Sequence, residues 1–286
     1  MVSVMDEHYS LSRRSFLSLI TVAPLGAVTA AAAWQHIPIG LELYSVRDAL
    51  QKDRSGTLRA VAKMGYECGE FFAPYYQWSP DEAKQVRREL DDLGLHCYST
   101  HNGPESFTAT GIGRAINLNH ILGAKYIVLA SAGDINTIDG WKQVADTLNK
   151  AADTLAGEGL LAGYHNHDLE FRPLEGKRPM EVIAANTAKS IMLQLDVGTC
   201  LEAGSDPVAW IESDPGRIRS LHLKEWSPTK GYRVLFGEGV APWKKIFAAA
   251  ESTGGVEFYL IEQEGSDYPE LETAQRCLEA YRKMRA

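Results

Sequence analysis

The chain alternates eight times between a short apolar run that is typical of a β-strand and a longer amphipathic run that is typical of an α-helix. The expected strands cover residues 37–44, 66–72, 95–100, 126–130, 160–164, 191–197, 218–223 and 257–261. The expected helices cover residues 56–64, 80–93, 112–122, 139–156, 180–186, 207–212, 243–252 and 269–285. Eight such βα units within about 250 residues predict an α/β fold of the (β/α)8 TIM barrel type, built as a single domain.

Glycines lie at several helix-to-strand junctions of this alternation, and the glycine pattern helps to distinguish two α/β folds. Gly65, Gly94, Gly123 and Gly159 each stand between an expected helix and the next strand, where a residue with left-handed backbone can end the helix. The alternative fold is an open doubly wound sheet, which would carry a Gly-x-Gly-x-x-Gly sequence after its first strand. No such sequence follows residue 44, and polar residues follow nearly every strand, so the barrel is favoured.

The first 33 residues are expected to be a twin-arginine-type signal peptide. Arg13 and Arg14 precede residues 19–33, which carry no charge, and small residues at 30–33 offer a cleavage site. The alternatives are a membrane anchor or a disordered tail, but the uncharged run is shorter than the roughly 20 residues of a spanning helix. We therefore expect a barrel domain of residues 34–286 that is exported to the periplasm or beyond by the twin-arginine route, without stable membrane insertion after signal removal.

Charge and cysteine content narrow the class of partner. The formal net charge is −8 and no basic stripe is visible, so nucleic acid is not expected as a partner. The acidic balance is compatible with a bound cation and with a small neutral substrate such as a carbohydrate, and a homo-oligomer is compatible with the sequence. The four cysteines have no metal-binding spacing and are expected to be free and buried; they are Cys68, Cys97, Cys200 and Cys277.

Four polar residues stand at the ends of four consecutive expected strands. They are His165, Asp196, His222 and Glu262, each among apolar residues. Because the active site of a TIM barrel lies at the C-terminal ends of its strands, these side chains should converge. Imidazole and carboxylate ligands together suit one divalent ion such as Mn, Zn, Co, Fe or Mg. A lone buried histidine is more often a hydrogen-bonded structural residue, but four converging candidates favour a metal site.

Several short motifs resemble a known family. They are GLELYSVR at 40–47, GYHNHD at 163–168, LDVG at 195–198, HLK at 222–224 and GEGV at 237–240. In this order they resemble the xylose-isomerase-like TIM barrel superfamily, in its sugar phosphate isomerase/epimerase branch, over essentially the whole expected domain. The resemblance implies a metal held by Glu, Asp, His and Glu on strands five to eight. Asp196, His222 and Glu262 match the last three positions, whereas His165 replaces the first carboxylate.

This replacement bears on the reaction, because the resemblance implies that the strand-five and strand-eight carboxylates exchange the substrate proton in epimerases. The run 165–167 also resembles relatives that act on 3-keto-sugars, and export disfavours phosphorylated sugars, which are intracellular. We expect a divalent-metal-dependent isomerase or epimerase of an unphosphorylated sugar or keto-sugar, acting through proton abstraction and a metal-stabilised enediolate. A 3-keto-glycoside lyase or hydrolase is the alternative. A noncatalytic sugar-binding protein or an endonuclease-like phosphodiesterase is less favoured.

Roles are expected for the other polar residues near the strand ends. Glu262 or His167 is the expected base, with His101 and Lys224 as proton donors or oxyanion partners. The residues expected to bind substrate or to support the metal ligands are Glu42, Tyr44, Glu70, Asn166 and Trp226. For Glu42, a simple ion pair with Arg47 is the alternative.

Overall fold

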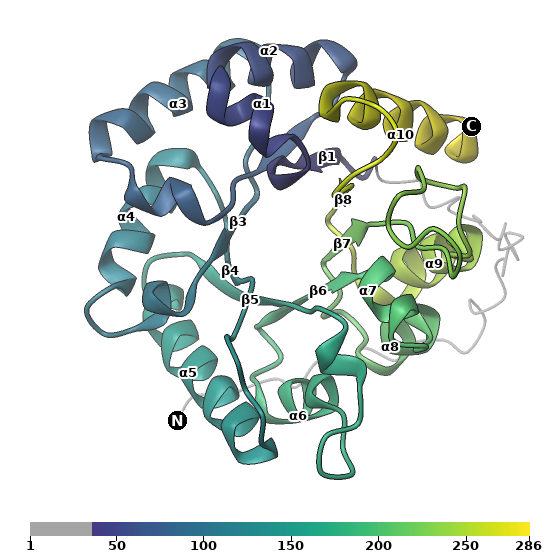
Figure 1. Cartoon of the computed structure of the whole chain (residues 1–286). Coiled ribbons are helices and arrows are strands. Elements are labelled where there is room, and N and C mark those ends of the chain that lie inside the picture. The colour runs from purple at the N-terminus through teal and green to yellow at the C-terminus, as the bar shows by residue number, and fades with distance from the viewer. Residues whose placement is uncertain (1–35) are drawn as a thin grey trace, which may run out of the picture. The chain divides into compact units, whose positions relative to one another are not determined.

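A ring of eight parallel strands forms the centre of the protein, with helices around it (Figure 1). The computed structural model describes residues 36–286, so the expected export signal, with Arg13 and Arg14, lies outside the described residues. Within them, Ile37–Ala286 form one compact unit. The strands are β1 (Ile39–Glu42), β2 (Cys68–Glu70), β3 (Ser99–Asn102), β4 (Tyr126–Leu129), β5 (Leu161–His165), β6 (Met192–Asp196), β7 (Ser220–Leu223) and β8 (Phe258–Ile261).

The barrel closes between β2 and β3. The hydrogen-bonded order β2-β1-β8-β7-β6-β5-β4-β3 leaves these two strands at the ends of the sheet. Parallel bridges join Phe71 to Thr100 and Cys68 to His96, and the His101 amide donates to the Phe71 carbonyl at 2.8 Å. These contacts confirm the predicted (β/α)8 TIM barrel.

Each of the eight expected helices is present, with ends within a few residues of the prediction, and two short helices are additional. The helices are α1 (Arg47–Lys52), α2 (Arg54–Met64), α3 (Pro80–Leu93), α4 (Ile112–Leu122), α5 (Ile138–Ala156), α6 (Pro179–Asn186), α7 (Val197–Glu202), α8 (Pro207–Ser213), α9 (Trp243–Ala249) and α10 (Glu270–Arg285). Gly65 and Gly94 end α2 and α3 with φ of 96° and 65°, the left-handed backbone expected of them. None of the helices in residues 36–286 is long and apolar enough to cross a membrane.

Each of the two additional helices follows a strand that ends in a capping carboxylate, which starts α7 itself and, in the other case, the turn before α1. The expected continuation of the first strand to residue 44 is wrong: β1 ends at Glu42, whose carboxylate accepts a hydrogen bond from the Tyr44 amide at 3.3 Å. A 3-10 turn (η1, Leu43–Val46) then leads into α1. In the same way, Asp196 at the end of β6 accepts from the Thr199 amide at 2.9 Å and begins α7. A side chain that satisfies such an amide turns the backbone into a helix at once.

Side chains from alternate strands stack in layers inside the barrel, as the fold requires. The even-numbered strands contribute a buried cluster that begins with Cys68, Tyr126, Met192 and Phe258. Two residues further along the same strands stand Glu70, Val128, Gln194 and Leu260. The odd-numbered strands contribute Glu42, His101, His165 and His222 to the layer above. The barrel interior therefore changes from apolar to polar as it approaches the C-terminal ends of the strands. All four cysteines are buried and free, as predicted.

Candidate active site and metal centre

Three histidines meet just inside the mouth of the barrel. His101 lies on β3, His165 on β5 and His222 on β7, and all three side chains are buried. The ring centroids of His101 and His165 are 4.5 Å apart, as are those of His165 and His222, and His101 stacks on His222 at 5.0 Å. The layer that the odd-numbered strands contribute is thus a compact group of imidazoles with Glu42 beside it.

The four predicted metal ligands converge at the edge of this layer. His165, Asp196, His222 and Glu262 each offer a ligand atom, and these atoms all lie within 4.8 Å of one another. His165 Nδ1 and Asp196 Oδ2 are buried and have no hydrogen-bond partner within residues 36–286. Since buried polar atoms almost always have a partner, these two unpartnered lone pairs fit a cation. The mix of imidazole and carboxylate suits a divalent metal ion, and it leaves the identity of that ion open.

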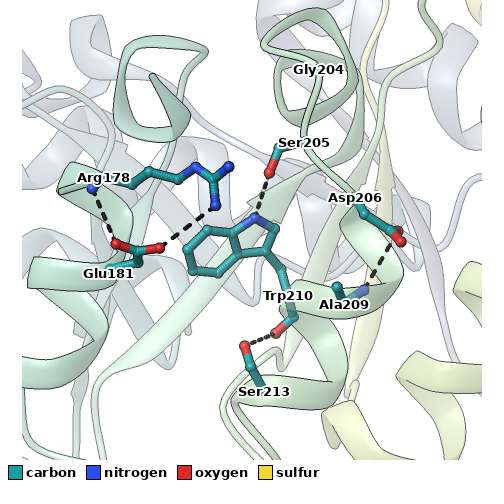
Figure 2. Close-up of a pocket in the computed structure, with 8 residues that line it drawn as sticks. All are labelled: Arg178, Glu181, Gly204, Ser205, Asp206, Ala209, Trp210 and Ser213. Atoms are coloured by element: carbon teal, nitrogen blue, oxygen red, sulfur yellow. Dashed lines mark hydrogen bonds and ion pairs between the residues drawn. The ribbon is translucent and has the colours of Figure 1, made fainter. Parts of the chain in front are cut away.

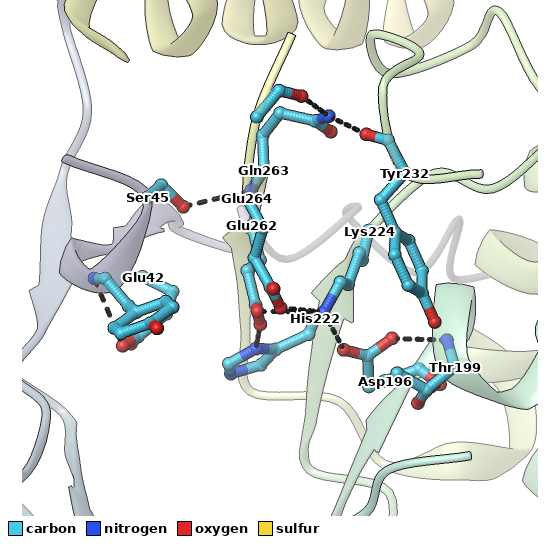
Figure 3. Close-up of polar contacts among 12 residues, drawn as sticks. Glu42, Ser45, Asp196, Thr199, His222, Lys224, Tyr232, Glu262, Gln263 and Glu264 are labelled. Atoms are coloured by element: carbon cyan, nitrogen blue, oxygen red, sulfur yellow. Dashed lines mark hydrogen bonds and ion pairs between the residues drawn. The ribbon is translucent and has the colours of Figure 1, made fainter. Parts of the chain in front are cut away.

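Lys224 supplies a buried positive charge beside this set. Its ammonium lies 3.1 Å from Glu262 Oε1 and 3.6 Å from Asp196 Oδ2, and it also pairs with Glu264 (Figure 3). It approaches the ring of Tyr232 to 4.6 Å from the centroid. Lys224 therefore bridges two candidate metal ligands.

Burial and neighbouring charges shift the pKa values of the site residues in opposite directions. Burial, reinforced by the rings of His222 and His101, holds the pKa of His165 well below its usual value, so this imidazole is neutral and free to act as a ligand. Burial opposes ionisation of Glu262, but Lys224 and His222 hold the pKa of its carboxyl well below the usual value. His222 lies between Glu262 and Glu70, which raise its pKa to about 10 despite burial. Burial and repulsion by Glu70 and Glu262 raise the pKa of Glu42.

Glu70 lies below the histidines and supports them. Its Oε2 lies 2.8 Å from His222 Nε2 and 3.1 Å from His101 Nε2, and its Oε1 accepts from Gln194 Nε2 at 3.0 Å. Burial alone would raise the pKa of Glu70, but the two adjacent rings hold it at about 2. With three donors around it, the carboxylate of Glu70 is fully engaged by the protein itself.

The other predicted substrate-binding residues lie at varied distances from the cluster. Asn166 accepts from the Asp196 amide at 3.1 Å and donates to Thr199 Oγ1 at 3.0 Å, so its amide group holds the start of α7. Tyr44 is 39% exposed and packs edge-on against Phe72. His167 is exposed, with its ring 5.1 Å from that of His165. The half-buried Trp226 lies in the loop after β7, where its carbonyl accepts from the Val240 amide.

Two buried polar residues that make several hydrogen bonds were absent from the predicted site. Gln194, inside β6, contacts both His101 and Glu70. Glu225 accepts from the Gly237 amide at 2.9 Å, the Ala241 amide at 3.1 Å and Trp243 Nε1 at 2.6 Å. The motif at 237–240 is thus wrapped around a buried carboxylate. An isolated glutamine or glutamate at a strand end gives no sequence signal for such a contact.

A separate pocket of about 480 Å³ lies on the surface beside α8 (Figure 2). Trp210 lies at its centre and donates from Nε1 to Ser205 Oγ at 2.8 Å, with Arg178 and Glu181 on the opposite side. Its lining residues come from the loops before α6 and α8 and from those helices. It shares no residue with the histidine cluster, so the barrel mouth remains the candidate active site.

Comparison with known proteins places the chain in a family. The family described as xylose isomerase-like TIM barrel matches residues 58–284. The chain belongs to this family. The matched span runs through β2 to β8 and includes His165, Asp196, His222 and Glu262.

Relatives with known names are similar along most of their length. An inosose dehydratase from Geobacillus thermodenitrificans is 23% identical over 224 residues, which cover 65% of this chain and 74% of that one. The structure of a sugar phosphate isomerase/epimerase from Parabacteroides distasonis is 26% identical with a TM-score of 0.73, over 90% of this chain and 97% of that one. An IolI protein with a zinc atom bound has a TM-score of 0.67 at 16% identity, over 86% and 97%. Two of these three relatives are thus named for an activity, one as a dehydratase and one as a sugar phosphate isomerase/epimerase.

Proposed function

We propose that the protein is a divalent-metal-dependent enzyme that removes a proton from the carbon beside the carbonyl of an unphosphorylated sugar or keto-sugar, and so isomerises or epimerises it. The observation that carries this proposal is the buried set of His165, Asp196, His222 and Glu262, two of which keep an atom without a hydrogen-bond partner from the described chain. When bound there, a divalent ion would polarise the carbonyl and stabilise the enediolate.

The residues of the chain supply the proton chemistry. Glu262 is held ionised by Lys224 and His222, so it can accept the proton from the carbon. Lys224 donates to Glu262 at 3.1 Å, which fixes the direction in which this carboxylate points. The same ammonium can donate to an oxygen on which negative charge develops. Isomerisation returns the proton to the neighbouring carbon, and epimerisation returns it to the opposite face of the same carbon.

Elimination is the second candidate, and two observations favour it. The relative from Geobacillus thermodenitrificans is named a dehydratase, an activity that removes water from a keto-compound. In this chain His165 also stands where the resemblance implies a second carboxylate, so one of the two bases of an epimerase is missing. In elimination, Glu262 takes the α-proton, the electron pair forms a double bond, and the β-oxygen leaves with a proton from a donor such as Lys224. If that oxygen is glycosidic, the protein is a 3-keto-glycoside lyase.

An unphosphorylated substrate and an exported protein are parts of the same proposal. Among residues 36–286, the cation beside the ligand set is Lys224, and three carboxylates already engage it. A phosphate group would therefore meet carboxylates rather than free cations at this part of the mouth. The twin arginines at 13–14 support export to a compartment where sugars are not phosphorylated.

Proton exchange in deuterated water tests the reaction. The purified protein with Zn²⁺ or Mn²⁺ is mixed with ketoses, inososes and 3-keto-glycosides, and NMR follows each substrate. We expect deuterium at the carbon beside the carbonyl; a rearranged sugar indicates isomerisation, and release of water or an alcohol indicates elimination. Absence of exchange with every compound would contradict proton abstraction.

Metal content tests the site itself. We expect one divalent ion per chain in the wild-type protein and its loss in Asp196→Ala and His222→Ala. His120→Ala is the matched control, because His120 lies on α4 and binds the Glu158 carbonyl away from the barrel mouth. Equal metal content in all these proteins would place the ion elsewhere.

A further inference from the structure

We propose that, in the metal-bound protein, Glu70 and Gln194 fix His101 and His222 in tautomers that carry hydrogen on Nε2, so that each ring turns an unprotonated Nδ1 into the mouth. In this arrangement His222 Nδ1 is the metal-ligating atom, and His101 Nδ1, beside Glu42, accepts a hydrogen bond from a hydroxyl group of the substrate. The inference rests on the proposed function and names the atoms that perform it.

The carboxylate of Glu70 sets the direction of every hydrogen bond below the histidines. It can accept but not donate, and three groups reach it: His222 Nε2 at 2.8 Å, His101 Nε2 at 3.1 Å and the Gln194 amide at 3.0 Å. Each of these must therefore present a hydrogen to Glu70. The side chain of Glu70 is fully buried.

Gln194 also requires a hydrogen on His101 Nε2. Its Nε2 faces Glu70 Oε1, which requires a donor at this position, so its Oε1 must be the atom that faces His101 Nε2 at 2.7 Å. The reversed amide would place two oxygens against each other. His101 Nε2 consequently lies between two acceptors, one from Gln194 and one from Glu70, and carries the hydrogen.

For His222 the consequence is a defined ligand atom. With hydrogen on Nε2, the lone pair of the neutral ring is on Nδ1, which faces Glu262 within the four-residue ligand set. Histidines that bind metals commonly donate their other ring nitrogen to a carboxylate, which fixes the ring and raises its basicity. Glu70 has this relation to His222.

For His101 the consequence is that Nδ1 is a hydrogen-bond acceptor that receives no donor from the described residues. Its Nδ1 lies 3.9 Å from Glu42 Oε1, too far for a hydrogen bond, and Glu42 Oε2 is buried without a partner among the described residues. Glu42 at the end of β1 lies beside Glu262, which follows β8, because Leu41 and Ile261 are paired in these two neighbouring strands. A hydroxyl group, which a polyhydroxylated substrate offers, can donate to His101 Nδ1 and form a second hydrogen bond with the Glu42 carboxyl group. His101 and Glu42 therefore supply a contact that orients the sugar next to Glu262.

The tautomers can be read directly. The purified full chain, labelled with ¹⁵N in its histidines and loaded with Zn²⁺, is examined by long-range ¹H–¹⁵N correlation NMR, and His101→Asn and His222→Asn assign the two rings. We expect hydrogen on Nε2 of both rings and a zinc-shifted Nδ1 in His222. Zinc binding with hydrogen on Nδ1 of either ring overturns this inference alone. A protein that binds no zinc overturns the proposed function as well.

Variants separate the roles of the supporting residues. Glu70→Gln should weaken Zn²⁺ binding by about 10- to 100-fold, the usual effect of losing a carboxylate behind a histidine ligand. Gln194→Met should leave zinc stoichiometry and the Nε2 hydrogen of His101 unchanged, because Glu70 still accepts from this ring, but should shift its ¹⁵N resonances; the exposed Gln143→Met is the control. Unchanged zinc affinity in the first variant, or an unchanged His101 spectrum in the second, would contradict the proposal.

Glu42→Gln distinguishes a hydroxyl acceptor from a metal ligand. Glu42, Glu70 and His101 also lie close enough together to suggest a second cation. If Glu42 accepts a substrate hydroxyl, the variant should raise KM while zinc stoichiometry and affinity stay at their wild-type values. A parallel loss of one zinc ion per chain would show that Glu42 is a ligand and would refute its assignment here.

Discussion

Replacing Lys224 with methionine should destabilise the metal-free protein far more than loss of an ordinary ion pair. Lys224 is buried, with 2% of its surface exposed, and its ammonium lies 3.1 Å from Glu262 and 3.6 Å from Asp196. Methionine keeps most of the volume of the side chain but removes the charge, so two buried carboxylates lose their shared cation. Breaking a buried pair in this way costs about 3–5 kcal/mol. For a domain of this size each kcal/mol lowers Tm by about 2–4 °C, which gives a decrease of about 6–20 °C.

The assay is thermal unfolding followed by circular dichroism, with EDTA and with Zn²⁺. Lys125→Met is the matched control, because Lys125 forms a 2.8 Å pair with Glu257 in which the side chains are 49% and 38% exposed. Such an exposed pair contributes about 1 kcal/mol or less, so the control should lose about 4 °C at most. Both variants remove a lysine, and they differ in burial.

Zinc should reduce the penalty of Lys224→Met. An ion held by Asp196 and Glu262 restores positive charge beside the two carboxylates, and any ligand that binds only the folded state raises its stability. The difference in Tm between wild-type and variant should therefore be smaller with zinc than with EDTA. The reasoning is refuted if the metal-free variant loses no more than Lys125→Met, or if zinc leaves the difference unchanged.

Three further outcomes follow from the same structure. Because the pKa of His222 is raised to about 10, Zn²⁺ must displace a proton from this ring at neutral pH. Zinc affinity should therefore rise with pH, about tenfold per pH unit for each proton released. Calorimetry in two buffers counts the released protons, and a count of zero would contradict this prediction. Arg217→Met should lower the free energy of unfolding in denaturant titration by about 3–5 kcal/mol, because the carboxylate of Asp214, 3.6 Å from the guanidinium, loses its buried cation; a loss no larger than that of Lys125→Met would contradict this. Glu225→Ala should make residues 226–241 sensitive to proteolysis, since four donors of this segment and α9 lose their acceptor; wild-type resistance would count against that role.

The barrel and the four candidate ligands could be predicted because both depend on local rules. Strand and helix periodicity identified the eight βα units, and the rule that the active site of a TIM barrel lies at its strand ends selected His165, Asp196, His222 and Glu262. The structure brings these four residues together. Their grouping needs no knowledge of side-chain detail, since β5 to β8 are consecutive neighbours in the sheet.

Contacts across the barrel could not be predicted in the same way. Glu70 on β2 binds His222 on β7, 152 residues later, and Gln194 on β6 reaches both Glu70 and His101. Alternation indicates which side chains point inward, but not which strand lies opposite at the same height, because that depends on the stagger of the closed sheet. The short turns after Glu42 and Asp196 were missed for a related reason: each begins with a single capping hydrogen bond, which leaves no periodic pattern.

The histidine at position 165 changes the charge of the ligand set as well as the number of bases. Its pKa is held well below the usual value, so it enters the set as a neutral group. Two carboxylates and two neutral imidazoles balance a divalent ion, whereas the Glu, Asp, His and Glu pattern implied by the resemblance would leave one negative charge. A set without excess negative charge opposes the formation of an oxyanion less, while the missing carboxylate removes one proton acceptor. These effects favour a reaction that needs strong stabilisation of an enediolate and a single base on one face. Isomerisation and elimination both meet these conditions, whereas epimerisation would need a second base from elsewhere in the mouth.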